Sequence, residues 1–495
     1  MRVISFLAQE TRDTVAIDYV SPTIETVIHQ TLGDEGSLAT KPTYEYVQLF
    51  SGQSSDGSPR LRQSQVRRPR PFGRATHTIR SMEQKDVLKA LQRDHAAELK
   101  LAAKRLKGTA RHTEIIPSRT LSELTGHEIL LKPENLQVTG SFKIRGAYNK
   151  IASLSEEQIA RGIVTASAGN HAQGVAYAAR ERHAKATICM PQITPPLKVD
   201  ATKAYGADVV LYGEVFDESA ARAQELSDKE GMIYVPPFDD YEVICGQGTI
   251  GLEILDQLPD LDAVIVPVGG GGLISGVAFA IKSLRPEVKV YGVQAEGAPS
   301  MYRSLHEHKY QTLKAVSTFA DGIQVKTPGE LTYQICEQYV DDIVTVSEDE
   351  TAAAILSLME NQKLVAEGAG AVPVAAVLFH KLPVEGKKVA CVVSGGNIDV
   401  NILNRVITRG LVMSGRKANM TIALEDKPGQ LKKVAEIVSR CGSNVVSVQH
   451  DGSDPNMPIS SCFLKLTLET RDAEQIEQIR AELAKEGFQL VSERV

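Results

Sequence analysis

Short apolar runs alternate with helix-length amphipathic segments from about residue 82 to residue 412. The runs read EILLKP, GIVTAS, KATICMP, ADVVLYG, MIYVPP, AVIVPVGGGG, VKVYGVQA, DIVTVS and KKVACVVSGG. Apolar, β-branched runs of this length, separated by helices, are typical of a largely parallel sheet covered on both faces. The pattern predicts an α/β fold, and the ligand site of such a fold lies at the carboxyl ends of its strands.

The C-terminal segment, residues 418–495, has a different pattern. Strand-like and helix-like stretches follow one another as β-α-β-β-α-β, from NMTIALED through KPGQLKKVAEIVSRCG to FQLVSERV. In the first of its helices, Leu431, Val434, Ile437 and Val438 fall on one face. We expect a separate ferredoxin-like domain here, joined to the larger domain by a linker at 413–417.

The first 81 residues are unlike the rest of the chain. They include SGQSSDGSPRLRQSQVRRPRPFGR, a polar, proline-rich and basic stretch with little periodicity, which predicts a disordered or non-native extension. The arginine cluster is compatible with a transit peptide or a nucleic-acid patch. The acidic residues at Glu10, Asp13, Asp18 and Glu25 argue against a transit peptide.

Composition narrows the class of partner. The net charge is -6 and the pI is near 6.1, so no domain-wide basic field is available to bind nucleic acid. The six cysteines are scattered without the spacing of a zinc site, and no apolar run has the length of a membrane span. We expect a cytoplasmic enzyme with reduced thiols, acting on small metabolites.

One lysine lies in an unusual context. In PENLQVTGSFKIRGAYNKI, Lys143 follows Thr139, Gly140, Ser141 and Phe142. One interpretation makes it a surface lysine on a helix whose N-cap is Ser141. The other makes it an amine held in a site, where it can form a Schiff base with an aldehyde cofactor.

Three further motifs each follow a predicted strand. SAGNHAQG, from Ser167 to Gly174, opens a helix whose N-terminus can bind an anion. VPVGGGGLISG places Gly269–Gly272 where backbone amides can surround a phosphate, without the lysine of a nucleotide-binding P-loop. VVSGGNID brings Ser394 to the same edge of the sheet. Each motif alone is compatible with a structural turn.

Taken in this order, the four motifs resemble the fold-type II pyridoxal-phosphate enzymes, and among them the threonine dehydratase and serine racemase branch. The resemblance covers residues 100–412 and implies parallel, doubly wound sheets in two subdomains. It implies pyridoxal 5'-phosphate as cofactor and Lys143 as its Schiff-base lysine. The other cofactor contacts that it implies are Phe142 beside the ring, Asn170 on the ring hydroxyl, Ser394 on the pyridine nitrogen, and Gly269, Gly270, Gly271, Gly272 and Leu273 around the phosphate.

The resemblance also implies a reaction. Ser167, Gly169, Asn170 and His171 would receive the substrate carboxylate, although His171 could instead be a packed histidine. The freed amine of Lys143 would remove the α-proton of L-threonine or L-serine, and the products would be a 2-oxo acid and ammonia.

Two other enzyme activities and one non-enzymatic role stay open. A serine or threonine racemase needs a proton donor on the opposite ring face, at the position of Ala168, and an alanine cannot supply it. A serine-preferring dehydratase is the second alternative. A catalytically silent amino-acid sensor is the third, although a sensor has no need of the Lys143 amine.

A cation site and a regulatory site complete the expectations. Related enzymes often bind a metal through an acid at the position of Gln294, with Glu296 two residues on, and we expect no metal here. EDKPGQL and the β-α-β-β-α-β plan resemble an ACT domain, which binds amino acids such as isoleucine or valine. Asp426, Gly429, Gln430 and Leu431 would contact that effector. The alternative is a purely dimerising unit, and a homodimer or homotetramer is expected in either case.

Overall fold

The structure is a computed structural model that describes residues 50–53, 59–61, 84–384, 388–452 and 458–491. The chain divides into two units, residues 1–76 and 77–495. In the first unit, the described residues are strands β1 (Phe50–Gln53) and β2 (Pro59–Leu61), which pair antiparallel. The extension predicted over residues 1–81 lies almost entirely outside the described residues, so its nature stays a prediction.

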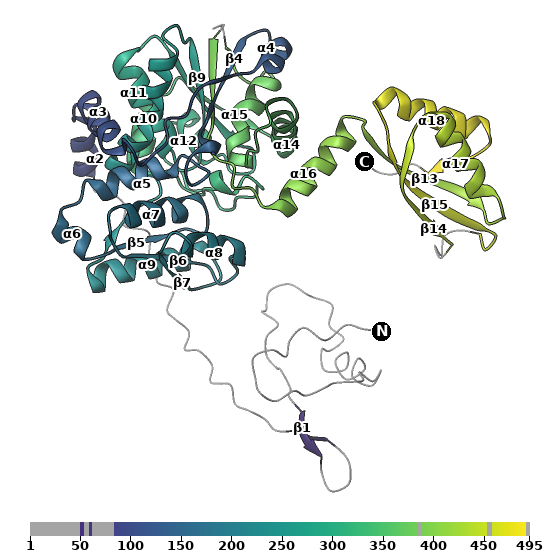
Figure 1. The fold of residues 1–495 in the computed structure, drawn as a ribbon, viewed down its shortest axis with the longest axis horizontal. Helices are drawn as coiled ribbons and strands as arrows, with labels where there is room; N and C mark the ends of the chain where they lie inside the picture. The colour runs from purple at the N-terminus through teal and green to yellow at the C-terminus, as the bar shows by residue number, and fades with distance from the viewer. Residues whose placement is uncertain (1–49, 54–58, 62–83, 385–387, 453–457, 492–495) are drawn as a thin grey trace. The chain divides into compact units, whose positions relative to one another are not determined.

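A six-stranded sheet forms the centre of the second unit (Figure 1). All its neighbouring strands are parallel except the short edge strand, which pairs antiparallel. In spatial order the strands are β11 (Asp342–Val346), β10 (Lys289–Ala295), β9 (Ala263–Pro267), β12 (Lys388–Val393), β4 (Glu128–Pro133) and β3 (Ile116–Pro117).

A second, four-stranded sheet is parallel throughout. Its strands, in spatial order, are β7 (Asp208–Leu211), β6 (Ala186–Met190), β5 (Ile163–Ala166) and β8 (Ile233–Tyr234). Each of the nine apolar runs named from the sequence forms one strand of these two sheets. The predicted α/β fold with two largely parallel subdomains is therefore confirmed.

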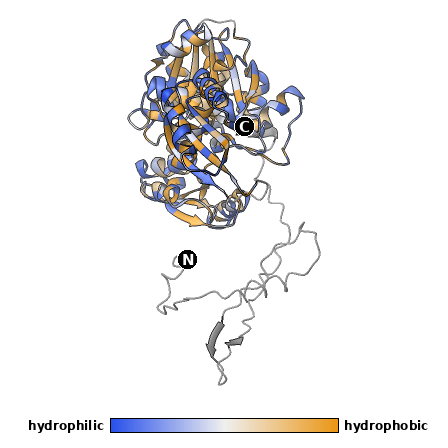
Figure 2. Cartoon of the chain, turned by 90° about the vertical axis from the view of Figure 1, so that its right-hand side faces the viewer, coloured by the Kyte–Doolittle hydropathy of each residue, from blue (hydrophilic) through white to orange (hydrophobic). Residues whose placement is uncertain are grey.

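Helices cover both faces of each sheet, because successive strand residues point to opposite sides. Along β9, Ile265 packs in a core with α15 (Gly368–Leu378), whereas Val264 and Val266 pack in another core with α11 (Gly272–Leu284). Figure 1 shows α11 and α15 on opposite sides of β9, and Figure 2 shows hydrophobic residues along the strands.

The helices and short helical turns of this part of the chain are α2 (Gln84–Leu91), α3 (His95–Leu106), α4 (Arg119–Thr125), η1 (Glu134–Leu136), α5 (Lys143–Ala152), α6 (Glu156–Ala160), α7 (Asn170–Glu181), α8 (Pro196–Lys203), α9 (Phe216–Glu230), α10 (Tyr241–Gln257), α11 (Gly272–Leu284), α12 (Ser300–His306), η2 (Asp321–Ile323), α13 (Glu330–Tyr339), α14 (Glu348–Ser357), η3 (Leu358–Gln362), α15 (Gly368–Leu378) and α16 (Val400–Met413). Among the described residues, no helix has the length and apolar character needed to cross a membrane.

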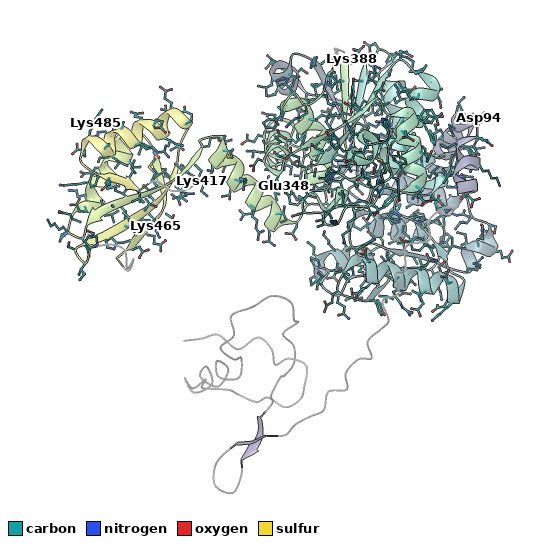
Figure 3. The ribbon with its side chains drawn as sticks, turned by 180° about the vertical axis from the view of Figure 1, so that it is seen from behind. Asp94, Glu348, Lys388, Lys417, Lys465 and Lys485 are labelled. Carbon is teal, nitrogen blue, oxygen red and sulfur yellow. The ribbon has the colours of Figure 1, made fainter. Side chains whose placement is uncertain are left out.

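The C-terminal segment forms a small antiparallel sheet with two helices. Its elements are β13 (Lys417–Glu425), α17 (Gln430–Arg440), β14 (Asn444–Asp451), β15 (Ser461–Glu469), α18 (Ala473–Lys485) and β16 (Gln489–Val491). The strand order is β14-β15-β13-β16, and Figure 3 labels Lys417 on β13, Lys465 on β15 and Lys485 on α18. The β-α-β-β-α-β order is confirmed, whereas the domain and linker boundaries stay predictions.

The four apolar residues of α17 named from the sequence differ in burial. Val434, Ile437 and Val438 of α17 are buried, as expected. Leu431, predicted on the same face of the helix, is 46% exposed. It lies in the first turn of the helix, beyond the edge of the apolar core.

Candidate active site

Lys143 is the first residue of α5, and the helix does not begin with a serine cap. Phe142 occupies the N-cap position without a side-chain hydrogen bond. Ser141 instead forms an antiparallel bridge with Gly395, and the Phe142 amide donates to the Ser394 carbonyl at 3.0 Å. The interpretation of Ser141 as N-cap is therefore wrong, because this segment pairs with the loop after β12.

The amine of Lys143 is held inside the protein. Its Nζ donates a hydrogen bond to the Pro237 carbonyl at 2.7 Å and lies 5.2 Å from the centre of the Phe142 ring. Burial lowers the pKa of Lys143 to about 8, although the nearby Glu367 opposes that shift. A minor fraction of the amine, about one tenth at pH 7, is therefore neutral, and the neutral form is the one that a nucleophile or a general base requires.

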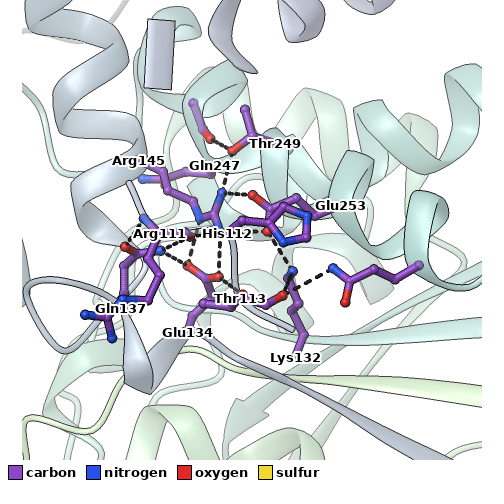
Figure 4. Close-up of polar contacts among 12 residues, drawn as sticks. Arg111, His112, Thr113, Lys132, Glu134, Gln137, Arg145, Gln247, Thr249 and Glu253 are labelled. Atoms are coloured by element: carbon purple, nitrogen blue, oxygen red, sulfur yellow. Dashed lines mark hydrogen bonds and ion pairs between the residues drawn. The ribbon is translucent and has the colours of Figure 1, made fainter. Parts of the chain in front are cut away.

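The helix that carries Lys143 is fixed by a buried ionic network (Figure 4). Two residues after Lys143, Arg145 forms ion pairs with Glu134 and Glu253. Lys132, at the end of β4, also pairs with Glu253, at 2.6 Å. The charged residues around the SFK sequence are thus not a solvated helix face, and they hold the start of α5 against β4 and α10.

The loop before α7 brings a second motif to the site. Ser167 Oγ accepts a hydrogen bond from the Gly169 amide at 3.2 Å, and α7 begins at Asn170. The Asn170 side chain accepts from Asn397 Nδ2 at 2.8 Å and donates to Glu367 Oε1 at 2.7 Å. Asn170 is therefore tied to two segments more than 190 residues away in sequence.

His171 is buried and neutral. Its Nε2 lies 2.9 Å from the Val235 carbonyl, which fixes the proton on Nε2, and burial lowers its pKa to about 3. The other ring nitrogen, Nδ1, then offers only a lone pair. The sequence predicted that His171 helps to receive a substrate carboxylate, but in this tautomer its free nitrogen can accept a hydrogen bond and cannot donate one.

The glycine loop connects β9 to α11. Gly271 has φ +98°, a left-handed conformation that a side chain rarely adopts. A Cβ on Gly270 would lie 2.5 Å from the ring of Phe238, which directly follows the Pro237 carbonyl that binds Lys143. Leu273 is buried in the first turn of α11. The loop thus places the amides of a helix N-terminus beside the segment that receives the lysine.

Ser394 follows β12 and is 2% exposed. Because β12 lies between β9 and β4, its carboxyl end is next to the glycine loop and the end of β4. The bridge from Ser141 to Gly395 brings Ser394 beside Phe142. The structure therefore gathers Phe142, Lys143, Asn170, Gly269–Gly272 and Ser394 around one site between the two sheets.

Two of the polar partners in this site were not predicted from the sequence. Glu367, which precedes α15, and Asn397 both bind the Asn170 side chain. The available signal for Glu367 is a single acid within LVAEGAGAVP, an otherwise small and apolar stretch. For Asn397 the signal is its place just after the Ser-Gly-Gly turn.

The structure also describes Gln294 and Glu296, at the position where related enzymes bind a metal. Gln294 is fully buried, donates to the Val268 carbonyl at 3.2 Å and accepts from the Tyr302 amide at 2.8 Å. Both ends of its side-chain amide are therefore hydrogen-bonded to uncharged backbone groups. Glu296 is exposed.

Asp426, Gly429, Gln430 and Leu431 lie together on the turn from β13 to α17. Asp426 Oδ1 is 3.6 Å from His450 Nε2. The Cys462 sulfur lies within 4.8 Å of an Asp426 carboxylate oxygen and of a His450 ring nitrogen. His450 and Cys462 were not predicted to lie beside this turn.

The residues present fit a phosphorylated aldehyde ring. Ser141 Oγ and His171 Nδ1 are buried without a hydrogen-bond partner among the described residues, so polar atoms are available inside the site. Lys143 supplies a buried amine for the aldehyde, and the glycine loop and the N-terminus of α11 supply amides for the phosphate.

Comparisons with known proteins agree with this geometry. Residues 106–395 match the family described as "Pyridoxal-phosphate dependent enzyme". The chain is 53% identical over 393 residues to an L-threonine ammonia-lyase of Thermotoga maritima, covering 79% of this chain and 98% of that protein.

Two solved structures are also similar. A threonine deaminase from Solanum lycopersicum matches with TM-score 0.61 and 41% identity, over 66% of this chain and 94% of that one. A maize serine racemase matches with TM-score 0.61 and 33% identity, over 64% and 98%. This chain belongs to the family of pyridoxal-phosphate dependent enzymes.

Proposed function

We propose that this protein is an L-threonine ammonia-lyase, which converts L-threonine to 2-oxobutanoate and ammonia and also converts L-serine to pyruvate. The observation that carries the proposal is the meeting of Lys143, Asn170, Ser394 and the glycine loop at one site. The 53% identity to an L-threonine ammonia-lyase, over 98% of that protein, supports the choice of substrate.

Pyridoxal phosphate, when bound, supplies an electron-withdrawing ring that acidifies the α-proton of the amino acid and so allows the β-hydroxyl to leave. The amides of Gly269–Gly272 and the start of α11 would hold its phosphate. Asn170 would donate to the ring hydroxyl, and Ser394 would face the ring nitrogen as a neutral hydroxyl. Phe142 would pack beside the ring.

Lys143 is the proposed general base. Its pKa of about 8 leaves part of the amine neutral near neutral pH, so it can accept a proton from the α-carbon. The Pro237 carbonyl orients the amine, and Arg145 fixes the helix from which it projects. These contacts keep the base in place while the substrate binds.

The substrate carboxylate would lie at the N-terminus of α7, a 12-residue helix whose first amides follow Ser167, Ala168 and Gly169. Asn170 is the first residue of that helix. His171 would accept a hydrogen bond from the substrate through Nδ1, or serve only to pack against Val235.

The second candidate function is a serine or threonine racemase, which the likeness to maize serine racemase brings forward. Racemisation needs a proton donor on the ring face opposite Lys143. The side chain at the corresponding position is the methyl group of Ala168, which carries no exchangeable proton. Dehydration is therefore the favoured outcome.

The C-terminal segment, residues 418–495, would regulate the enzyme as an ACT domain. The turn with Asp426, Gly429, Gln430 and Leu431 would bind an aliphatic amino acid such as isoleucine or valine, with His450 as a further contact. We also propose a homodimer or homotetramer. A cytoplasmic location remains a prediction, supported by six free cysteines that are all buried.

The proposed activity is tested with purified full-length protein loaded with pyridoxal phosphate. L-Threonine should yield 2-oxobutanoate and ammonia in equal amounts, and L-serine should yield pyruvate more slowly. Chiral analysis of the remaining serine separates the second candidate, because a racemase produces D-serine. Turnover of neither amino acid would contradict both.

A further inference from the structure

Glu367 is a buried carboxylate at the edge of the site, and none of the catalytic roles above uses it. Its side chain is 3% exposed, and its amide donates to the Gly395 carbonyl at 3.0 Å. A Cβ added to Gly395 would collide with Glu367 Oε1 and lie 3.2 Å from Asn170 Nδ2. The carboxylate therefore packs directly against the turn that carries Ser394.

The Asn170 amide has one N–H donor left for a ligand. Its Oδ1 accepts from Asn397, and one N–H of its Nδ2 donates to Glu367 Oε1 at 2.7 Å. Asn397 is itself anchored, because its Nδ2 also donates to the Thr139 carbonyl at 2.9 Å. An amide carries two N–H donors, so one N–H of Asn170 remains. Turning the Asn170 amide over would bring its N–H groups to Nδ2 of Asn397. That nitrogen is also a donor, so the observed orientation of the Asn170 amide is favoured.

The charged and polar groups around Glu367 come from four elements. Lys143 faces it from α5 and Lys198 from α8, while Asp321 faces it from η2 and forms a 2.8 Å ion pair with Lys198. Asn170 contributes from α7. Burial, followed by Asp321, raises the pKa of Glu367 to about 7, while Asn170, Lys198 and Lys143 act in the opposite direction. The carboxyl can therefore change charge near neutral pH.

We propose that Glu367 is a positioning residue, which acts through Asn170 by fixing its amide so that one N–H is directed to an anionic oxygen of the bound cofactor. The proposal rests on the proposed function, since it takes pyridoxal phosphate as the ligand. A carboxylate acceptor makes the hydrogen bond from Asn170 charge-assisted, which orients it more firmly than a neutral acceptor does. Glu367 itself need not touch the cofactor.

The test is a double-mutant cycle on cofactor binding. Full-length wild-type protein and the variants Asn170→Ala, Glu367→Ala and the double variant are freed of cofactor, checked for folding by circular dichroism, and titrated with pyridoxal phosphate by equilibrium dialysis. Each single change should weaken binding about tenfold, as loss of a supporting contact commonly does, and the double change should also weaken it only about tenfold. Glu296→Ala is the control for loss of a carboxylate, because Glu296 is exposed and is not among the groups that bind Asn170 or shift the pKa of Glu367.

An isosteric variant provides a second measurement that does not depend on the alanine variants folding. Glu367→Gln keeps an acceptor oxygen but cannot ionise. Wild-type affinity should rise as the pH rises through about 7, and this rise should be smaller in Glu367→Gln. Lys143 and the cofactor phosphate titrate in both proteins, so the difference between them reports Glu367.

The outcomes separate the inference from the proposed function. Unchanged affinity in Glu367→Ala, or a loss of about a hundredfold in the double variant, would overturn the positioning role, because independent effects multiply. The same pH dependence in wild type and Glu367→Gln would also overturn it. Failure of the wild-type protein to bind pyridoxal phosphate would overturn the proposed function, and this inference with it.

Discussion

Arg145 donates two hydrogen bonds to Glu134, from Nε to Oε2 and from Nη2 to Oε1, each 2.8 Å long, and both side chains are almost completely buried. This paired geometry satisfies both carboxylate oxygens, and Thr113 adds a further donor at 2.7 Å. Since Arg145 lies two residues after Lys143, the pair fixes the start of the helix that carries the proposed base.

Replacing Arg145 by methionine should destabilise the protein strongly. Removal of one partner leaves a buried carboxylate uncompensated, which costs roughly 3–5 kcal/mol of unfolding free energy. Arg119→Met is the control, because its 2.7 Å pair with Glu123 is exposed on both sides and should contribute at most about 1 kcal/mol. Chemical denaturation of both variants measures the difference, and equal effects would contradict the structural role of Arg145.

Glu367→Gln should stabilise the cofactor-free protein at high pH and leave it almost unchanged at low pH. The pKa of Glu367 is about 7 in the folded protein against 4.5 for a free carboxyl. Between these values the folded state binds more protons than the unfolded state, so wild-type stability falls as the pH rises from about 4.5 to about 7. A glutamine cannot ionise, so the free energy of unfolding of Glu367→Gln at pH 8 should exceed that of wild type by at most about 3 kcal/mol.

Thermal unfolding at pH 5 and pH 8 measures this gain. A variant that is less stable than wild type at pH 8, or equally affected at both pH values, would contradict the assigned protonation of Glu367. Asp321→Asn gives a second check. Removal of this neighbouring negative charge should lower the pKa of Glu367, so the protein should lose less stability than wild type does between pH 5 and pH 8.

Much of this fold could be predicted from the sequence because its strands are nearly continuous apolar runs. Lys143, Gly269–Gly272 and Ser394 were also identifiable, since each directly follows or precedes a recognisable strand or helix. Glu367 was not, because its partner Asn170 lies 197 residues away, and no local pattern reports such a contact. Ser141 was misassigned as a helix cap for the same reason, since its bridge is to Gly395.

Ala168→Ser should gain measurable serine racemisation. The substitution adds a hydroxyl where a methyl group now stands, in the loop between β5 and α7, and in the proposed arrangement this hydroxyl would be the proton donor on the ring face opposite Lys143. Chiral chromatography of L-serine incubated with the cofactor-loaded variant measures D-serine, with wild type as the reference. Absence of D-serine from a folded, cofactor-loaded variant would contradict the assigned position of Ala168.

A chain ending at Arg416 should keep threonine turnover and lose its response to isoleucine or valine. The residues proposed for catalysis all precede Arg416, while the proposed effector contacts lie after it. Coupling through a second site typically changes apparent affinity roughly 5- to 150-fold. Threonine saturation curves with and without effector measure it in both proteins, and a truncated enzyme with the full response would place the regulatory site elsewhere.

The measurement that tests the account most directly is the release of 2-oxobutanoate and ammonia from L-threonine by wild type, Lys143→Ala and Lys150→Ala. Lys150 is on the same helix and forms a 2.6 Å ion pair with Asp240, so it controls for loss of a lysine from α5. We predict turnover by wild type and by Lys150→Ala, and a loss of several orders of magnitude in Lys143→Ala, which lacks both the anchoring amine and the base. Substantial turnover by Lys143→Ala would contradict the central role of Lys143.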